Sequence, residues 1–228
     1  MNIKLNVIIT GASKGIGLEL CRLALTEGHH VLAVARTASQ STGLKKLTSD
    51  FSSNLISLDL DITATSSRQK ILSEIKNWQS VDLLINNAGV LDESQSEEAL
   101  LNSFRLNAIA PFLLTESLVP KLKQGSKPVV AQITSRMGSI AEVTSAGHCG
   151  YRASKAALNM FNKSLALENK WLTALVIHPG WVKTDMGGPE APVTAFDSAR
   201  GIWNVIDVAR EKSQSGQFFD YRGRPIPW

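Results

Sequence analysis

Cysteine is scarce in this chain, since only two of its 228 residues, Cys21 and Cys149, carry a thiol. Neither lies at a spacing typical of metal ligands, and two isolated thiols fit a reducing compartment. We therefore expect unpaired cysteines, no metal site and a cytoplasmic protein. For Cys149 the favoured interpretation is a small packing residue, and the alternative is a reactive thiol that modulates activity.

Long hydrophobic runs are also absent. The longest apolar stretches, such as Val31–Ala35, fall far short of the ~18 residues that span a bilayer. Met1 is followed by Asn-Ile-Lys-Leu-Asn and then a strand-like run, which does not resemble a signal peptide. We expect neither a membrane helix nor a membrane partner.

The chain also has little net charge, because 24 Lys+Arg residues and 20 Asp+Glu residues leave a net charge of +4. No more than two basic residues are adjacent, which favours a solvated surface over a nucleic-acid-binding stripe. The small excess is compatible with an anionic small ligand. With 43% hydrophobic residues, the chain can build one continuous core.

Short β-branched runs alternate with longer amphipathic segments along the whole chain, as in parallel sheets covered by helices on both faces. The expected strands are Lys4–Thr10, His30–Ala35, Leu55–Leu60, Val81–Asn86, Lys127–Thr134, Ala174–His178 and Gly216–Asp220. The expected helices are Gly15–Glu27, Ser39–Ser49, Thr65–Trp78, Glu97–Leu122, Tyr151–Asn169 and Ala195–Lys212. This order predicts an α/β protein with a single domain over residues 1–228, a Rossmann-type doubly wound parallel sheet of about seven strands.

The first expected strand ends in a glycine-rich turn with the spacing G-x-x-x-G-x-G. Glycines permit a tight turn and a close approach of the backbone to a pyrophosphate, while the amides that begin the next helix face the phosphates. The residues expected to contact a dinucleotide here are Gly11, Ser13, Lys14, Gly15, Ile16 and Gly17.

The residue after the second expected strand is Arg36, where an NAD site usually carries Asp or Glu. Arg36 and Lys14 can together hold a 2′-phosphate through charge-assisted contacts, which favours NADP(H) over NAD(H). The alternative is that both are surface cations at loop ends.

The next two expected strands offer further contacts at their carboxyl ends. Asp61, followed by Ile62, can accept a hydrogen bond from an adenine amino group and is favoured over Asp59, which can instead pair locally. The fourth strand runs into Asn87, Ala88 and Gly89. Such small residues suit close contact with a ribose, although a simple turn uses the same residue types.

Tyr151 and Lys155 are four residues apart at the start of an expected helix and so share one face. A nearby ammonium lowers the pKa of a phenol, so the pair can form a tuned acid. Ser135, at the carboxyl end of the fifth expected strand, can donate to a substrate oxygen on which negative charge develops. Its neighbour Thr134 lies on the other face of the pleat.

Asn107 stands four residues before Pro111 within the fourth expected helix. A proline cannot donate to the carbonyl four residues back, so the Asn107 carbonyl is expected to be unpaired at a kink and able to hold a water. The alternative is a kink with a packing role only.

These motifs, in this order and spacing, resemble the short-chain dehydrogenase/reductase family over nearly the whole chain. The residues that carry the resemblance are Thr10–Gly17, Asn86–Gly89, Asn107, Ser135, Tyr151–Lys155 and Pro179–Gly180. The segments Ser135–Lys155, His178–Pro189 and Phe218–Trp228 look like the subgroup of C-factor and sniffer-type carbonyl reductases.

The resemblance implies an NADPH-dependent oxidoreductase that reduces a small-molecule carbonyl, namely a ketone, aldehyde or quinone. Tyr151 would donate the proton, Ser135 would polarise the carbonyl oxygen, and Lys155 would bind the nicotinamide ribose. Asn107 would hold a water that relays protons toward Lys155. The contacts implied at the nicotinamide end are Pro179, Gly180, Val182 and Thr184.

One departure from the family pattern is a longer interval between Ser135 and Tyr151 than compact members have. The loop Met137–Gly150 therefore carries an insertion that should form part of the substrate pocket, with Met137 as a candidate contact. The insertion adjoins the helix pair through which many members assemble, so a homodimer and a homotetramer both remain open.

The irregular segment Gly180–Val193 has two interpretations, a mobile flap beside the site or an ordinary surface loop. Within it, Trp181 either lines the substrate site or anchors the flap. The alternative function is a dinucleotide-binding signalling or regulatory protein of C-factor type with little or no turnover.

Overall fold

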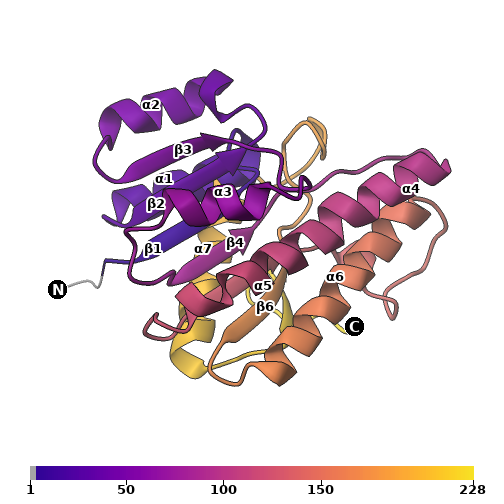
Figure 1. Ribbon diagram of the computed structural model, residues 1–228. Coiled ribbons are helices and arrows are strands. Elements are labelled where there is room, and N and C mark those ends of the chain that lie inside the picture. The colour runs from indigo at the N-terminus through magenta and orange to yellow at the C-terminus, as the bar shows by residue number, and fades with distance from the viewer. Residues whose placement is uncertain (1–3) are drawn as a thin grey trace.

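Seven parallel strands form one sheet in the order β3-β2-β1-β4-β5-β6-β7, which confirms the expected doubly wound architecture (Figure 1). The computed structural model describes residues 4–228. The strands are β1 (Asn6–Thr10), β2 (His30–Ala35), β3 (Leu55–Asp59), β4 (Leu83–Asn86), β5 (Val129–Ile133), β6 (Thr173–His178) and β7 (Gln217–Asp220). The chain moves outward from β1 to β3 and then crosses to β4, so its order reverses between β1 and β4. A ligand crevice is expected at this reversal.

Helices cover both faces of the sheet (Figure 1). They are α1 (Gly15–Thr26), α2 (Thr42–Asp50), α3 (Ser67–Glu74), α4 (Glu97–Phe104), α5 (Ala110–Leu122), α6 (Cys149–Glu168) and α7 (Ala195–Lys212). Two short 3-10 turns, η1 (Ala38–Gln40) and η3 (Arg136–Gly138), lie between them. Within residues 4–228, no helix is both long and apolar enough to cross a bilayer.

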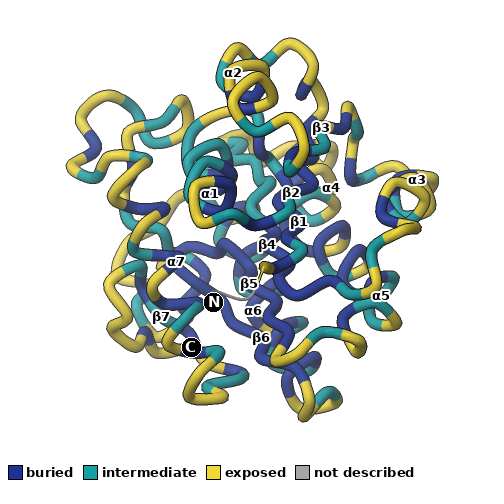
Figure 2. Tube along the Cα trace, turned by 90° about the vertical axis from the view of Figure 1, so that its left-hand side faces the viewer, coloured by how far each residue is buried: buried dark blue, intermediate teal, exposed yellow. Residues whose placement is uncertain are grey.

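The strands are buried on both sides because alternate side chains enter two different cores. Val7 and Ile9 of β1 pack into the core that contains helix α1, whereas Ile8 packs into the core beneath α3 and α5. Figure 2 shows the sheet as the buried centre of the molecule, with exposure concentrated in the loops and outer helix faces. This two-sided burial explains why the strands are continuous apolar runs.

The helix expected over Glu97–Leu122 is interrupted. Between α4 and α5 lies a π turn, η2 (Arg105–Ile109), in which the amide of Ala110 donates to the carbonyl of Arg105. The turn ends just before Pro111, which removes one donor from the helical ladder. The proline thus produces the expected irregularity at Asn107 as a local widening of the helix.

Smaller differences concern helix ends. Helix α2 begins at Thr42 because η1 precedes it, and Ser41 caps the helix by accepting a hydrogen bond from the Leu44 amide. Helix α6 begins at Cys149 instead of Tyr151. Cys149 is exposed, so its favoured interpretation as a packing residue is wrong, because the first residue of α6 points away from the core.

Candidate active site

The turn between β1 and α1 packs directly against the loop that follows β4. A Cβ atom on Gly17 would lie 2.3 Å from the Gly11 carbonyl oxygen, and one on Gly11 would lie 2.8 Å from the Cα of Ala88. The Asn87 side-chain amide donates to the carbonyls of Thr10 (3.0 Å) and Gly11 (3.2 Å). The structure therefore brings Gly11 and Gly17 of the first motif against Asn87 and Ala88 of the second.

Two features of this turn fit a pyrophosphate. Gly11 (φ +66°) and Gly15 (φ +57°) adopt left-handed backbone conformations that few other residues tolerate. Lys14 occupies the N-cap of α1 without capping it through its side chain, and the first turn of that helix, Gly15–Leu18, contains no acidic residue. The amides at the start of α1 are therefore oriented for an anion.

Replacing Gly17 with alanine should weaken both stability and dinucleotide binding. The added methyl group meets backbone, which cannot rotate away, so α1 must shift at a cost of about 1–3 kcal/mol in unfolding free energy. Thermal unfolding and fluorescence titration with NADPH measure the two effects. Gly43→Ala is the control, because its nearest contact is the flexible end of Leu18. Parent-like stability and affinity in Gly17→Ala would show that the turn does not need this glycine.

Arg36 and Asp61 follow neighbouring strands and lie near each other. Burial raises the pKa of the Asp61 carboxyl, but hydrogen bonds from Thr63 and the nearby Arg36 charge together hold it below its usual value. Asp59 accepts a hydrogen bond from the Ser39 amide (2.7 Å), which confirms its expected local pairing. Ile62 is buried among core residues beneath α3 and contributes packing at this edge.

Lys14 makes a contact that sequence analysis did not anticipate, an ion pair with Asp185 in the segment after β6. Both side chains are more than two-thirds exposed, so water screens the ion pair and it opens easily. The two residues are 171 positions apart, and no local pattern connects them. In this structure Lys14 is thus paired with Asp185, while Arg36 lies beside Asp61.

Tyr151, Lys155 and Ser135 meet where β5 ends and α6 begins. The Lys155 ammonium donates to the Ile133 carbonyl (2.8 Å) and lies 5.8 Å from the centre of the Tyr151 ring. Burial raises the pKa of Tyr151, while hydrogen bonding with the Ser135 side chain partly counteracts that rise. The expected lowering of the phenol pKa by Lys155 is therefore wrong for this structure, because burial dominates and Lys155 is directed at a carbonyl. Burial therefore favours the protonated phenol, the form that can donate a proton.

Lys155 itself should show a distinctive pH dependence. Burial lowers its pKa from 10.5 to about 8, so between these values the unfolded chain binds more protons than the folded one. The contribution of Lys155 to stability therefore rises with pH across that window, and below it the buried ammonium costs up to about 3 kcal/mol. Lys155→Met should gain stability relative to the parent at pH 7, with the gain shrinking toward pH 10.

Urea unfolding of both proteins from pH 7 to pH 10 measures this difference, with the exposed Lys212→Met as the control. A difference between Lys155→Met and the parent that stays constant with pH would contradict the prediction.

The Asn107 side chain joins the loop after β4 to α6. Its oxygen accepts from the Val90 amide (2.8 Å), and its nitrogen donates to the Val90 carbonyl (2.9 Å) and to the Ser154 hydroxyl (3.0 Å). A Cβ atom on Gly89 would lie 3.2 Å from the Asn107 side-chain oxygen and 3.5 Å from the Lys155 nitrogen. Sequence analysis missed the role of Ser154, which also donates to the Tyr151 carbonyl (2.8 Å) and so fixes this part of α6.

The segment after β6 reaches back over the glycine-rich turn. Gly180 has φ +88°, Ser198 donates to the Pro179 carbonyl (2.7 Å), and Val182 forms an isolated bridge with Val193. The methyl group of Thr184 lies 3.1 Å from where a Cβ on Gly15 would be. The segment is thus an internally bonded loop that touches the proposed phosphate site.

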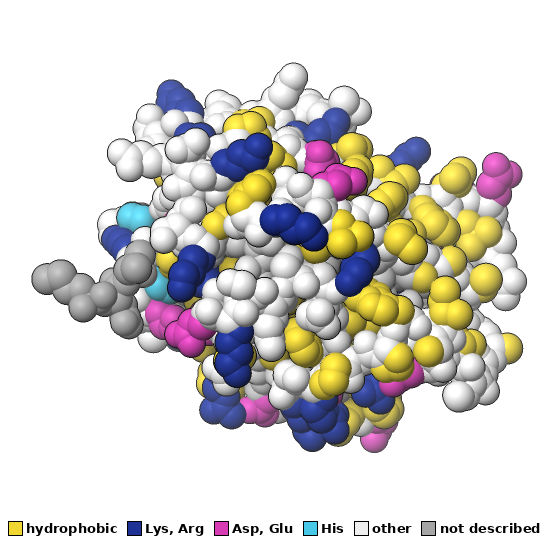
Figure 3. Space-filling model, turned by 90° about the horizontal axis from the view of Figure 1, so that it is seen from below, with side chains coloured by type: hydrophobic (Ala, Val, Ile, Leu, Met, Phe, Trp, Pro, Cys, Tyr) yellow, Lys and Arg dark blue, Asp and Glu magenta, His cyan; other side chains and the backbone are white. Residues whose placement is uncertain are grey.

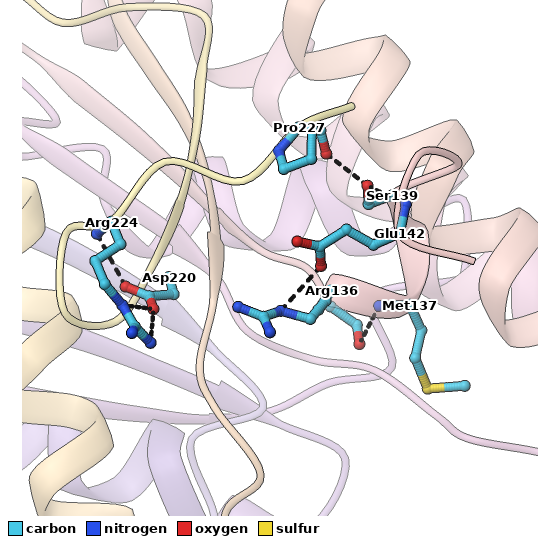
Figure 4. Close-up of polar contacts among 8 residues, drawn as sticks. Arg136, Met137, Ser139, Glu142, Asp220, Arg224 and Pro227 are labelled. Atoms are coloured by element: carbon cyan, nitrogen blue, oxygen red, sulfur yellow. Dashed lines mark hydrogen bonds and ion pairs between the residues drawn. The ribbon is translucent and has the colours of Figure 1, made fainter. Parts of the chain in front are cut away.

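The two substrate candidates lie on the loops after β5 and β6. Trp181 is 57% exposed and its indole donates to the Gly187 carbonyl (2.7 Å), so it anchors the loop while presenting its ring to solvent. Met137 is half-buried, and its amide donates to the Ser135 hydroxyl (3.1 Å; Figure 4). Both residues therefore flank the carboxyl ends of adjacent strands.

A doubly wound sheet with a glycine-rich turn at its order reversal, beside a buried Tyr-Lys-Ser group, defines a Rossmann-type oxidoreductase. The family model described as short chain dehydrogenase matches residues 5–193, and the chain belongs to that family.

Three known proteins illustrate the similarity. "C-signal" of Myxococcus xanthus is 45% identical over 157 residues, which cover 65% of this chain and 93% of that protein. The carbonyl reductase Sniffer of D. melanogaster superposes with a TM-score of 0.92 at 31% identity, covering 99% of this chain and 100% of that one. A carbonyl reductase from Pseudomonas aeruginosa in complex with NADP has a TM-score of 0.86 at 34% identity, with 99% and 100% coverage.

Proposed function

We propose that this protein is an NADPH-dependent reductase that converts a ketone, aldehyde or quinone into an alcohol, with Tyr151 as the proton donor. The observation that carries the proposal is the buried phenol of Tyr151, which lies beside Ser135 at the end of β5 with the Lys155 ammonium 5.8 Å from its ring. The carbonyl reductases among the similar structures support the reaction type.

The residues present fit a nicotinamide dinucleotide. The glycine cradle and the amides of α1 suit its pyrophosphate, and a side chain at Gly89 would crowd Asn107 and Lys155 where a ribose is expected. The exposed Arg36, beside Asp61, supplies the charge that favours a 2′-phosphate. The chemistry that such a cofactor supplies when bound is hydride transfer.

The chain's own residues then have distinct tasks. Tyr151 donates its proton to the carbonyl oxygen, and the Ser135 hydroxyl donates a hydrogen bond to the same atom as negative charge develops. Lys155 holds the ribose and returns a proton toward Tyr151. The side-chain atoms of Asn107 are committed to Val90 and Ser154, so its main-chain carbonyl is the group that would hold the relaying water.

The direct test is consumption of NADPH with a panel of small ketones, aldehydes and quinones. Turnover of at least one compound class, with a stronger response to NADPH than to NADH, is the expected result. Tight NADP(H) binding in calorimetry with no turnover across the panel would instead favour the second candidate, a dinucleotide-binding signalling protein. The 45% identity to C-signal is the observation behind that candidate.

We also propose a homo-oligomer in a reducing, cytoplasmic setting, consistent with the two unpaired cysteines. The face formed by α4, η2, α5 and α6 exposes apolar side chains, which gather on the side of the molecule seen at right in Figure 3. They include Leu101, Ile109, Leu113, Met160 and Leu167. Such a face suits a second copy of the chain, and light scattering of the purified protein tests it.

A further inference from the structure

The five residues Arg224–Trp228, here called the C-terminal strap, lie against the outer edge of β7. The Asp220 amide donates to the Arg224 carbonyl (2.8 Å), and the Ile226 amide donates to the Phe218 carbonyl (2.8 Å). An antiparallel bridge joins Phe219 to Pro225. The strap thus occupies the hydrogen-bonding positions that this edge strand would otherwise expose.

The turn that leads into the strap is fixed by a buried carboxylate. Asp220 is 1% exposed and accepts hydrogen bonds from the amides of Arg222 and Arg224, both at 2.9 Å. It also accepts from the Arg224 guanidinium at 2.7 Å (Figure 4). These three bonds set the direction in which the strap leaves the sheet.

The far end of the strap reaches the loop that follows Ser135. The Ser139 hydroxyl donates to the Pro227 carbonyl (2.6 Å), and the Ala141 amide donates to the Trp228 carbonyl (3.0 Å). Figure 4 shows Pro227 facing Ser139, with Glu142 and Arg136 beside them. The Trp228 ring packs 5.6 Å from the Phe218 ring and lies beneath the Lys163 ammonium of α6 at 5.7 Å. The strap therefore ties β7 and α6 to this loop.

The segment held by the strap, residues 135–142, is itself part of the candidate active site. The Met137 amide donates to the Ser135 hydroxyl, and the Arg136 guanidinium pairs with Glu142 at 3.0 Å. At its centre, a Cβ on Gly138 would lie 2.9 Å from the main-chain carbon of Lys155. A displacement of residues 139–142 would thus pass mainly to Met137, which continues the same loop.

We propose that the C-terminal strap is a positioning element of the substrate site, which holds the wall formed by residues 136–142 against α6. This role rests on the proposed carbonyl reductase function. Ser135 is also held by the end of β5, where the Thr134 amide donates to the Ile177 carbonyl (3.0 Å). Loosening the strap therefore affects mainly the wall that binds the substrate, and the group that polarises the carbonyl much less.

The test compares Trp228→Ala with the parent in steady-state kinetics. The KM for the carbonyl substrate should rise about fivefold, the factor that corresponds to the loss of one aromatic packing contact, while kcat changes less than twofold. NADPH affinity should stay unchanged, because its expected contacts lie on other loops. Ser139→Ala, which removes the bond to Pro227, should give the same pattern, and Trp228→Phe should restore the parental KM.

Trp171→Ala is the matched control. Trp171 is also partly exposed, at 36% against 42% for Trp228, and also lies beneath a lysine, Lys123, at 5.6 Å. It connects α6 to β6 away from the strap, so its loss should alter stability without changing KM.

Hydrogen exchange supplies a readout that does not depend on activity. In Trp228→Ala the amides of Met137 and Ala141 should exchange faster, while those of β5 keep the parental rate. An unchanged KM, with or without faster exchange, would overturn the positioning role. If the parent reduces no carbonyl, the proposed function fails. In that case, unchanged hydrogen exchange at Met137 and Ala141 in Trp228→Ala would show that the strap does not stabilise the loop. Faster exchange at these amides would support the stabilisation.

Discussion

Tyr151→Phe should reduce kcat/KM for carbonyl reduction by about 10²–10⁴-fold, the range expected when a positioned general acid is removed. Tyr151 is buried, and the Ser135 side chain lies close enough to lower the pKa of its phenol against the effect of burial. Phenylalanine keeps the ring and its packing but leaves the developing alkoxide with no proton donor. Progress curves of NADPH absorbance with the best compound of the panel measure the loss.

The chain offers a matched control, since its second tyrosine, Tyr221, lies on the turn after β7, where its hydroxyl accepts from Arg222 (2.9 Å). Tyr221→Phe should keep most of the activity. NADPH binding, followed by fluorescence, should be preserved in Tyr151→Phe, so that a loss of turnover reports chemistry. If Tyr151→Phe retains more than half of the parental kcat/KM, another group donates the proton.

The fold could be predicted from the sequence because its signals are local. The central strands are apolar runs buried on both sides, and longer amphipathic segments alternate with them along the chain. The helix expected over Glu97–Leu122 shows the limit of this approach. Periodicity alone does not distinguish an α-helix from one with a π turn, and Pro111 located the irregularity at Asn107 without specifying its form.

In the candidate site, too, some features could be predicted from the sequence and others could not. Ser135, Tyr151, Lys155 and Asn107 were predicted from local signals, namely a strand end, a helical spacing and a proline, together with the family resemblance. The structure places these residues close together. The Lys14–Asp185 pair and the Ser139–Pro227 hydrogen bond join residues 171 and 88 positions apart, so only the three-dimensional structure shows them. The raised pKa of Tyr151 could not be predicted from the sequence either, because the burial that causes it depends on the whole fold.

Cofactor preference is the second property for which a large effect is expected. Arg36→Asp should shift the ratio of kcat/KM values for NADPH and NADH toward NADH by about 10²-fold or more. Loss of a charge-assisted contact with the 2′-phosphate accounts for about 1.5–3 kcal/mol, and repulsion by the new carboxylate adds to it. The same carboxylate can accept hydrogen bonds from the ribose hydroxyls of NADH, which should improve as a substrate.

Two features make substitution of Arg36 a clearer test of cofactor preference than substitution of Lys14. Arg36 lies close enough to Asp61 to lower the pKa of its carboxyl, so its charge acts at the carboxyl ends of β2 and β3. Lys14 is already paired with Asp185, and removing it changes the loop contact as well as any phosphate contact. Lys212→Asp, at the exposed end of α7, alters the net charge equally and should leave the cofactor ratio unchanged. An unchanged ratio in Arg36→Asp would refute the phosphate role of this residue, whereas a reversed ratio with normal turnover would assign cofactor selection to the end of β2.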